Sequence, residues 1–159
     1  MRWKSLRALA SRGLVCHESI TKMTPVTPEQ NDALLPFIEK FEKKGFTTGK
    51  WNSAKGELPS FSFDEDVISF LQTLDEYGWV TPEFNWIAWK ASAEKYISDS
   101  SAIKTADATT IQKLFTTHVR SERFSEGHLA SVFRNGHILD LLHRLKVIRS
   151  VMEEVDYNV

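Results

Sequence analysis

The residues best suited to chemistry are concentrated in one stretch of the last third of the chain. Eleven residues there contain two arginines, two glutamates and two histidines: His118, Arg120, Glu122, Arg123, Glu126 and His128. An arginine guanidinium presents N–H donors that match a phosphate or a carboxylate, and a histidine titrates near neutral pH. The stretch spans the junction between two predicted helices, and Ser125 is the expected N-cap of the second one. This composition could orient an anion, contact a partner or stage a proton transfer.

Three interpretations of this junction are open from the sequence alone: a structural turn, a contact with a ligand or a partner, and catalysis. In the first, Arg120 and Arg123 pair with Glu122, Glu126 or helix-end carbonyls and lock a tight turn between the helices. In the second, the junction faces a ligand or a partner, together with a tryptophan from a predicted hairpin. We favour the first, with the adjoining surface contacting a protein partner. The candidate binding residues are Arg120, Arg123, Glu126, His128 and Trp51.

The sequence contains few other signatures of a chemical site. The five histidines, at positions 17, 118, 128, 137 and 143, are never three or four residues apart, so no helix offers two imidazoles to one metal. The chain has no glycine-rich phosphate loop and no Gly-x-Ser-x-Gly nucleophile motif. Its single cysteine excludes a disulfide framework and fits a reducing cytosol. We therefore predict no catalytic residue, no metal ligand and no cofactor.

Length and composition predict one globular domain. The chain has 159 residues, of which 42% are hydrophobic and 26% charged. No apolar run approaches the roughly 20 residues that span a bilayer, so no membrane partner is expected. The net charge of −1 conceals an uneven distribution of charge along the chain. Residues 112–149 carry seven basic and three acidic residues, whereas residues 27–111 carry eight basic and fourteen acidic residues. The basic and acidic segments either form separate faces of the molecule or pack together and neutralise each other.

Helical periodicity and capping signals dominate the chain. Thr27, Pro28 and Gln30 form a capping-box pattern, and Pro36 predicts a kink in the first helix. Residues 46–51 and 60–63 are β-prone and indicate a small hairpin. The fold class predicted is mainly α (α+β): a compact single-domain helical bundle with a small two-stranded β-hairpin between the first and second helices. The most regular helix begins near Ile138.

Three side chains are assigned to the core from their helical spacing. His118 follows Leu114 by one turn, on the apolar side of its helix. Trp86 and Trp89 share a face with further apolar residues, so both are expected to be largely inaccessible. Trp51, in the hairpin, is equally compatible with packing and with an exposed contact.

The domain boundaries follow composition. Residues 1–24 form a basic extension that we expect to be disordered or to result from an over-extended gene start, with Met23 as the initiator. Residues 25–150 form the globular domain. Residues 151–159 form an acidic tail containing Glu153, Glu154 and Asp156.

Several strings resemble a family of small uncharacterised bacterial proteins, a domain of unknown function. They include Phe84 to Trp89, the stretch from Thr116 to Leu129, and Gly136 to Ile138. Arg-x-x-Arg-Phe-x-x-Gly, from Arg120 to Gly127, is the most specific marker. The resemblance covers about residues 30–148 and implies neither an activity nor a cofactor.

Three functions remain open. The first is a small cytosolic interaction or accessory module that acts through a surface near residues 118–128, on a protein partner or by self-association. The second is a nucleic-acid-binding protein that uses the basic helices of residues 112–149, with a turn at Asn135-Gly136 imitating a helix-turn-helix. The third is an enzyme or anion-binding domain with an Arg/Glu/His pocket. The sequence favours the first.

Overall fold

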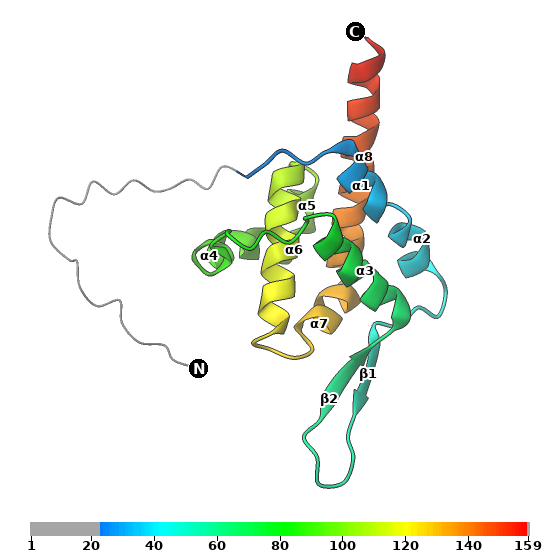
Figure 1. Cartoon of the computed structure of the whole chain (residues 1–159), viewed down its shortest axis with the longest axis vertical. Helices are drawn as coiled ribbons and strands as arrows, with labels where there is room; N and C mark the ends of the chain where they lie inside the picture. The colour runs from blue at the N-terminus through cyan, green and yellow to red at the C-terminus, as the bar shows by residue number, and fades with distance from the viewer. Residues whose placement is uncertain (1–22, 159) are drawn as a thin grey trace, which may run out of the picture.

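The computed structural model describes residues 23–158 of the chain (Figure 1). It is a mainly α fold with one two-stranded antiparallel sheet. The elements in chain order are α1 (Pro28–Leu34), α2 (Phe37–Glu42), β1 (Gly49–Asn52), β2 (Ser60–Phe63), α3 (Glu65–Glu76), α4 (Trp86–Ser98), α5 (Ser100–Ile103), α6 (Ala108–Glu122), α7 (His128–Arg134) and α8 (His137–Tyr157). The predicted fold class is confirmed. The predictions for residues 1–22 lie outside the described part of the chain.

Local signals account for the first helices. Thr27 caps α1, with its side chain accepting from the Gln30 N–H and the Gln30 side chain accepting from the Thr27 N–H, so the predicted capping box is confirmed. Pro36 separates α1 from α2, as expected of a residue that cannot donate within a helix. The predicted first helix is therefore two short helices, and the hairpin follows the second.

The longest helix, α8, is the centre of the bundle. It packs against α1, α2, α5, α6 and α7. Its inner face contributes Ile138, Leu141, Leu142 and Leu145 to the core, all essentially inaccessible. The helix continues to Tyr157, so residues 151–157 are its last turns.

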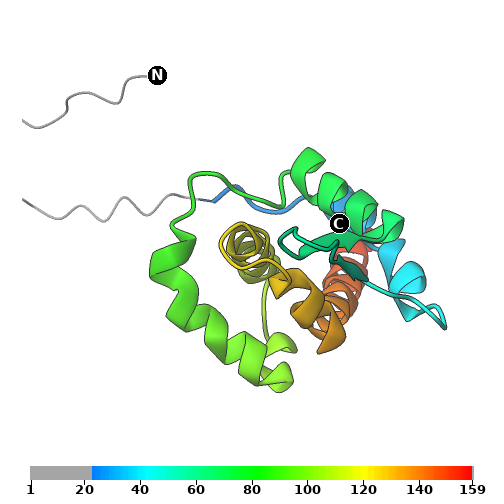
Figure 2. The same cartoon turned by 90° about the horizontal axis from the view of Figure 1, so that it is seen from below.

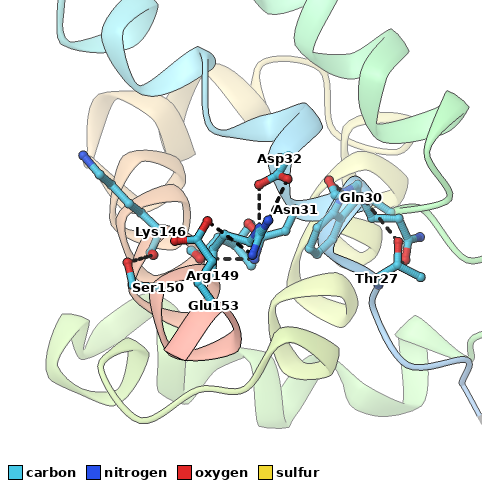
Figure 3. Close-up of polar contacts among 10 residues, drawn as sticks. Thr27, Gln30, Asn31, Asp32, Lys146, Arg149, Ser150 and Glu153 are labelled. Atoms are coloured by element: carbon cyan, nitrogen blue, oxygen red, sulfur yellow. Dashed lines mark hydrogen bonds and ion pairs between the residues drawn. The ribbon is translucent and has the colours of Figure 1, made fainter. Parts of the chain in front are cut away.

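Helix α1 is held on α8 by polar contacts as well as by apolar packing (Figure 3). The Arg149 guanidinium donates to both carboxylate oxygens of Asp32, at 2.7 and 3.2 Å. The buried Asn31 side chain donates to the Leu145 carbonyl at 3.2 Å. These contacts join segments more than a hundred residues apart and fix the start of the domain to its last helix.

The core is rich in aromatic rings. Phe70 lies at its centre and makes edge-to-face contacts with Phe37, Phe41, Phe115 and Phe133. Trp79, which directly follows Gly78 after α3, is fully buried, and its indole N–H donates to the Gln30 carbonyl at 2.8 Å. These contacts make Trp79 the main tryptophan of the core.

Helix α4 lies along the outside of α6, on the side of the molecule away from α2 and α3 (Figure 2). Only Ala93 of this helix is fully buried. The prediction that Trp86 and Trp89 would be largely inaccessible is wrong, because both are half-buried between α6 and solvent. The apolar spacing of this helix reflects packing on a single neighbour. None of the helices that the structure describes is both long and apolar enough to cross a membrane.

Candidate functional site

The candidate site lies where α6 ends and α7 begins, at residues 118–128, and we call it the junction. Glu122, the last residue of α6, turns its carboxylate toward the start of α7. Its Oε1 accepts from the Gly127 N–H at 2.9 Å, and its Oε2 accepts from the Leu129 N–H at 2.7 Å. Free N–H groups at a helix start favour a negative charge, so this carboxylate caps α7. The predicted cap, Ser125, is wrong, because α7 begins at His128 with Gly127 at its N-cap.

The two arginines are not used inside the junction. Within residues 23–158, no hydrogen bond or ion pair is made by the guanidinium of Arg120 or Arg123. Arg123 is exposed and Arg120 half-buried. The interpretation that both arginines pair with Glu122, Glu126 or helix-end carbonyls to lock the turn is therefore wrong. Both glutamates instead bind backbone N–H groups, which leaves the arginines available to an external group.

The hairpin of β1 and β2 is attached to the junction at two points. Glu126 Oε1 accepts from the Phe61 N–H of β2 at 2.6 Å. The indole of Trp51 in β1 packs against Gly127, where an added Cβ would lie 2.8 Å from the ring. Trp51 nevertheless remains 53% exposed, so it combines packing with an open face. The structure thus brings Trp51 and Glu126, two of the predicted residues, to one place.

A cleft of about 400 Å³ opens between the hairpin and α7. Its walls include the aromatic rings of Trp51, Phe61 and Phe133. Lys50 and Arg134 also line it and make it basic. In the loop of the junction, Phe124 is 80% exposed, with its ring 5.9 Å from that of Trp86. The loop of the junction thus carries an exposed phenylalanine next to α4, and the tryptophan of the hairpin lies on Gly127 at the end of the same loop.

Below this surface, three helices bring three histidines together. His118 of α6 is 1% exposed, and its Nδ1 lies 3.1 Å from Nε2 of His128 in α7. The ring of His137, the first residue of α8, lies edge-on to that of His118 with 4.9 Å between centroids. The prediction that His118 belongs to the core is confirmed. We call these three residues the histidine cluster.

Burial keeps the histidine cluster neutral near pH 7. Desolvation, followed by repulsion from the two neighbouring imidazoles, holds the pKa of His118 well below its usual value. Desolvation, followed by repulsion from the His128 imidazole, lowers the pKa of His137 to about 4. Burial also lowers the pKa of His128, although the Glu122 carboxylate acts in the opposite direction. A neutral pair can share one proton between His118 and His128, one ring donating and the other accepting.

The cluster is not arranged as a metal site. Among the described residues, no group of three or more histidine, cysteine, aspartate or glutamate side chains is placed to hold a metal ion. The Nε2 atoms of His118 and His137 are buried without a hydrogen-bond partner in the described chain. The arrangement is a packed, partly unsatisfied polar cluster beneath the junction.

Sequence reasoning missed this cluster because it tested histidine spacing within single helices. The signal that could have found it is a repeated Gly-His pair. Gly127 precedes His128 and Gly136 precedes His137, each glycine with a positive φ, 88° and 77°, at a helix N-cap. A glycine in this conformation lets the chain turn sharply into a helix, so each histidine begins a helix, and the ring of each lies against His118 of α6.

Comparison with known proteins identifies the family of the chain. The model of a family of unknown function, DUF6508, matches residues 26–151. The chain belongs to this family. The matched range includes the hairpin, the junction and the histidine cluster. No curated protein and no solved structure matches the chain. The family description names no activity, so the function must be argued from the site itself.

Proposed function

We propose that this DUF6508 chain is a small cytosolic interaction module that binds a protein partner through the junction surface, which comprises Trp51, Arg120, Arg123 and Phe124. The observation that carries the proposal is that the guanidinium groups of Arg120 and Arg123 have no partner among residues 23–158, in the same stretch as an 80% exposed phenylalanine. Tryptophan and arginine are enriched among residues that dominate binding energy.

The support beneath this surface is rigid. Glu122 fixes the start of α7, Glu126 holds β2, and Trp51 packs on Gly127. A preformed surface loses little conformational entropy on binding. Glu126 and His128 thus act as positioning residues in this proposal, and the arginines and aromatic rings make the contacts.

The chemistry of the surface favours an acidic segment with at least one apolar side chain as the partner. A guanidinium binds a carboxylate through two parallel hydrogen bonds. Lys50 and Arg134 extend the positive charge into the adjoining cleft, whose walls also hold aromatic rings. The Arg-x-x-Arg-Phe-x-x-Gly string supplies both free arginines, the exposed phenylalanine and the glycine under Trp51, which explains why these types occur together.

The helix-turn-helix alternative has less support. A recognition helix needs a free face for the major groove. Helix α8 would have to serve, yet its first turns pack against the rest of the bundle through Ile138, Leu141 and Leu142. Part of the basic block is also engaged internally, since Arg149 binds Asp32 and the Arg144 Nε donates to the Ala106 carbonyl.

The proposal is tested with a double variant and a matched control. Arg123→Glu/Phe124→Ala reverses one charge and removes one exposed ring at the junction surface. Lys146→Glu/Tyr157→Ala makes the same two changes on α8, whose free end lies at the opposite end of the molecule from the hairpin (Figure 1). Both should unfold at nearly the wild-type temperature, since all four side chains are exposed.

The measurement is quantitative affinity capture followed by titration of the purified partner. Arg123→Glu/Phe124→Ala should weaken the dissociation constant at least about tenfold, whereas the α8 control should leave it unchanged. Equal binding by both variants would contradict the proposal. Retention of DNA or RNA at physiological ionic strength, falling steeply with added salt, would instead favour the nucleic-acid alternative.

A further inference from the structure

The end of α8 carries an apolar stripe that no other part of residues 23–158 covers. The last turns of the helix project beyond the bundle (Figure 1). Val147, Val151 and Val155 follow one another at intervals of four residues and are 52–60% exposed. Residues at this spacing lie on one face of a helix. Ile148 and Met152, half-buried, border the valines, and these five residues form what we call the α8 stripe.

The α8 stripe continues a row of apolar residues that is buried in the N-terminal part of the helix. Leu141, Leu145, Ile148, Met152 and Val155 are separated by four, three, four and three residues. This spacing is the pattern by which one helix packs along another. Leu141 and Leu145 are fully buried in the bundle. The same apolar pattern therefore continues into the last turns of α8, which project beyond the other helices (Figure 1).

The opposite side of α8 is already occupied. Arg149 reaches Asp32 of α1 and also lies 3.4 Å from the Glu153 carboxylate (Figure 3). These two positions follow Val147 and Val151 by two residues, which places them about 200° around the helix. Helix α1 thus binds one side of α8 and does not cover Val147, Val151 and Val155.

Grooves along the stripe are shaped for an elongated apolar element. One groove of about 480 Å³ is lined by Pro28, Ile148, Val151, Met152 and Val155. A second, of about 350 Å³, adjoins it through Arg144 and Val147 and extends to α5. Together they follow the helix axis from α5 to the end of α8.

Charge is distributed unequally along these grooves. The charged residues at the inner end, next to α5, are Lys104, Asp140 and Arg144. The acidic residues at or beside the outer end are Glu154 and Asp156. The inner end is therefore net positive and the outer end net negative, so the surface is complementary to its own reversed copy.

We propose that the α8 stripe is a self-association surface on which a second copy of this chain places its own α8 in the antiparallel direction. With Val151 of the two copies facing each other, Val147 of one lies level with Val155 of the other. The acidic outer end of each helix then lies beside Lys104 and Arg144 of its partner. One patch used twice in this way forms a closed two-fold dimer.

A second copy fits the surface better than an unrelated helix because the match is reciprocal. The α8 stripe of each copy contacts the stripe of the other, and the acidic end of each copy lies beside the basic end of the other, so no two acidic ends are adjacent. The proposed surface is also independent of the junction surface, because the hairpin and the free end of α8 lie at opposite ends of the molecule (Figure 1).

The experiment measures the oligomeric state of the full chain by sedimentation equilibrium, from micromolar to near-millimolar protein. Val151→Glu places a carboxylate in the centre of the stripe. Ser150→Glu adds the same charge one residue earlier, on an exposed position outside the stripe. Wild type and Ser150→Glu should form a reversible dimer with dissociation constants within about threefold of each other. Val151→Glu should weaken dimerisation by about tenfold or more.

A charge exchange tests the antiparallel direction. Lys104→Glu alone should weaken the dimer, because it sets a carboxylate beside the partner's Asp156. Lys104→Glu/Asp156→Lys should recover part of the loss. If Val151→Glu disturbs the helix by circular dichroism, Val155→Glu on the projecting end provides the same test.

A wild-type chain that stays monomeric at near-millimolar concentration would overturn the proposal. A dimer that Val151→Glu and Val155→Glu both leave intact would overturn it as well. Occupation of the grooves by residues 1–22 would give a monomeric full chain, and a chain shortened to residues 23–159 that then dimerises would identify that occupant.

Discussion

The indole ring of Trp51 rests on the backbone of Gly127, and a Cβ added to that glycine would lie 2.8 Å from the ring atom Cζ2. This contact joins the hairpin to the start of α7. It requires glycine twice over, because Gly127 also has a φ of 88°, a conformation that side-chain-bearing residues adopt at a cost. The indole of Trp51 thus occupies the space that a side chain at position 127 would fill, and this contact fixes its place in the junction surface.

Gly127→Ala is expected to destabilise the fold and to move Trp51. The left-handed backbone alone costs about 1 kcal/mol for alanine, and displacement of the indole adds to it. Urea denaturation measures the loss, and tryptophan fluorescence should shift to the red as the ring becomes more exposed. Gly136→Ala is the control, because Gly136 has a similar φ of 77° but open space around its Cβ position. Equal losses for both variants would show that Trp51 does not pack on this glycine.

A second expectation concerns the cap of α7. Glu122→Gln replaces a carboxylate that accepts from two N–H groups with an amide that has only one acceptor oxygen. The free energy of unfolding should fall by about 1–2 kcal/mol, the usual cost of losing a cap or a charge-assisted hydrogen bond. Ser125→Ala should change it by less than about 0.5 kcal/mol, because the α7 start is capped from Glu122. A larger loss at Ser125 would restore the role that the sequence alone assigns to it.

Local signals were enough to predict much of the fold. The capping box at Thr27, the break at Pro36 and the caps at Asn85 and Asp107 depend on residues within a few positions of one another. The sequence itself contains that information, so these helix starts could be predicted. The position of His118 in the core followed in the same way from the apolar residues on its own helix.

Contacts between distant segments could not be predicted in this way. The histidine cluster needs the crossing of α6, α7 and α8, and no spacing within one helix encodes it. Glu122 and Glu126 could bind nearby arginines or backbone N–H groups, and local composition does not decide between them. Glu122 binds the partly buried N–H groups at the start of α7, which are costly to leave unpaired, and Glu126 binds the N–H of Phe61 in β2.

Trp79 and Trp89 provide a third test, on which the sequence and the structure differ. Trp79 is fully buried and donates a hydrogen bond to Gln30, whereas Trp89 is half-buried beside Lys113. Trp79→Ala should therefore cost about 3–5 kcal/mol, the usual range for a buried aromatic residue. Trp89→Ala should cost clearly less, since part of its surface already contacts water. Chemical denaturation of the two variants compares them, and a reversed order would contradict the burial seen in the structure.

The last expectation is that stability falls in mild acid because of the histidine cluster. Burial lowers the pKa of His118 well below 6.5 and that of His137 to about 4, so between these values the unfolded chain binds more protons than the folded one. Stability is therefore fully present above pH 6.5 and is lost as the pH falls. Each such histidine contributes up to about 1.4 kcal/mol per pH unit, or on the order of 2 kcal/mol between pH 6.5 and about 5.

Denaturant unfolding across this pH range measures how steeply the free energy of unfolding changes with pH. This slope can be compared between variants even where their absolute stabilities differ. His137→Gln removes one titrating group and should reduce the slope by about a third to a half, because His118 and, to a smaller extent, His128 supply the remainder. His143→Gln, at an exposed position of α8, should leave the decline in place. The range above pH 5 is the informative one, because carboxylates titrate mainly below it. A stability that stays level from pH 7 to 5, or a slope that His143→Gln abolishes and His137→Gln does not, would show that the buried cluster is not the acid-sensitive part of the fold.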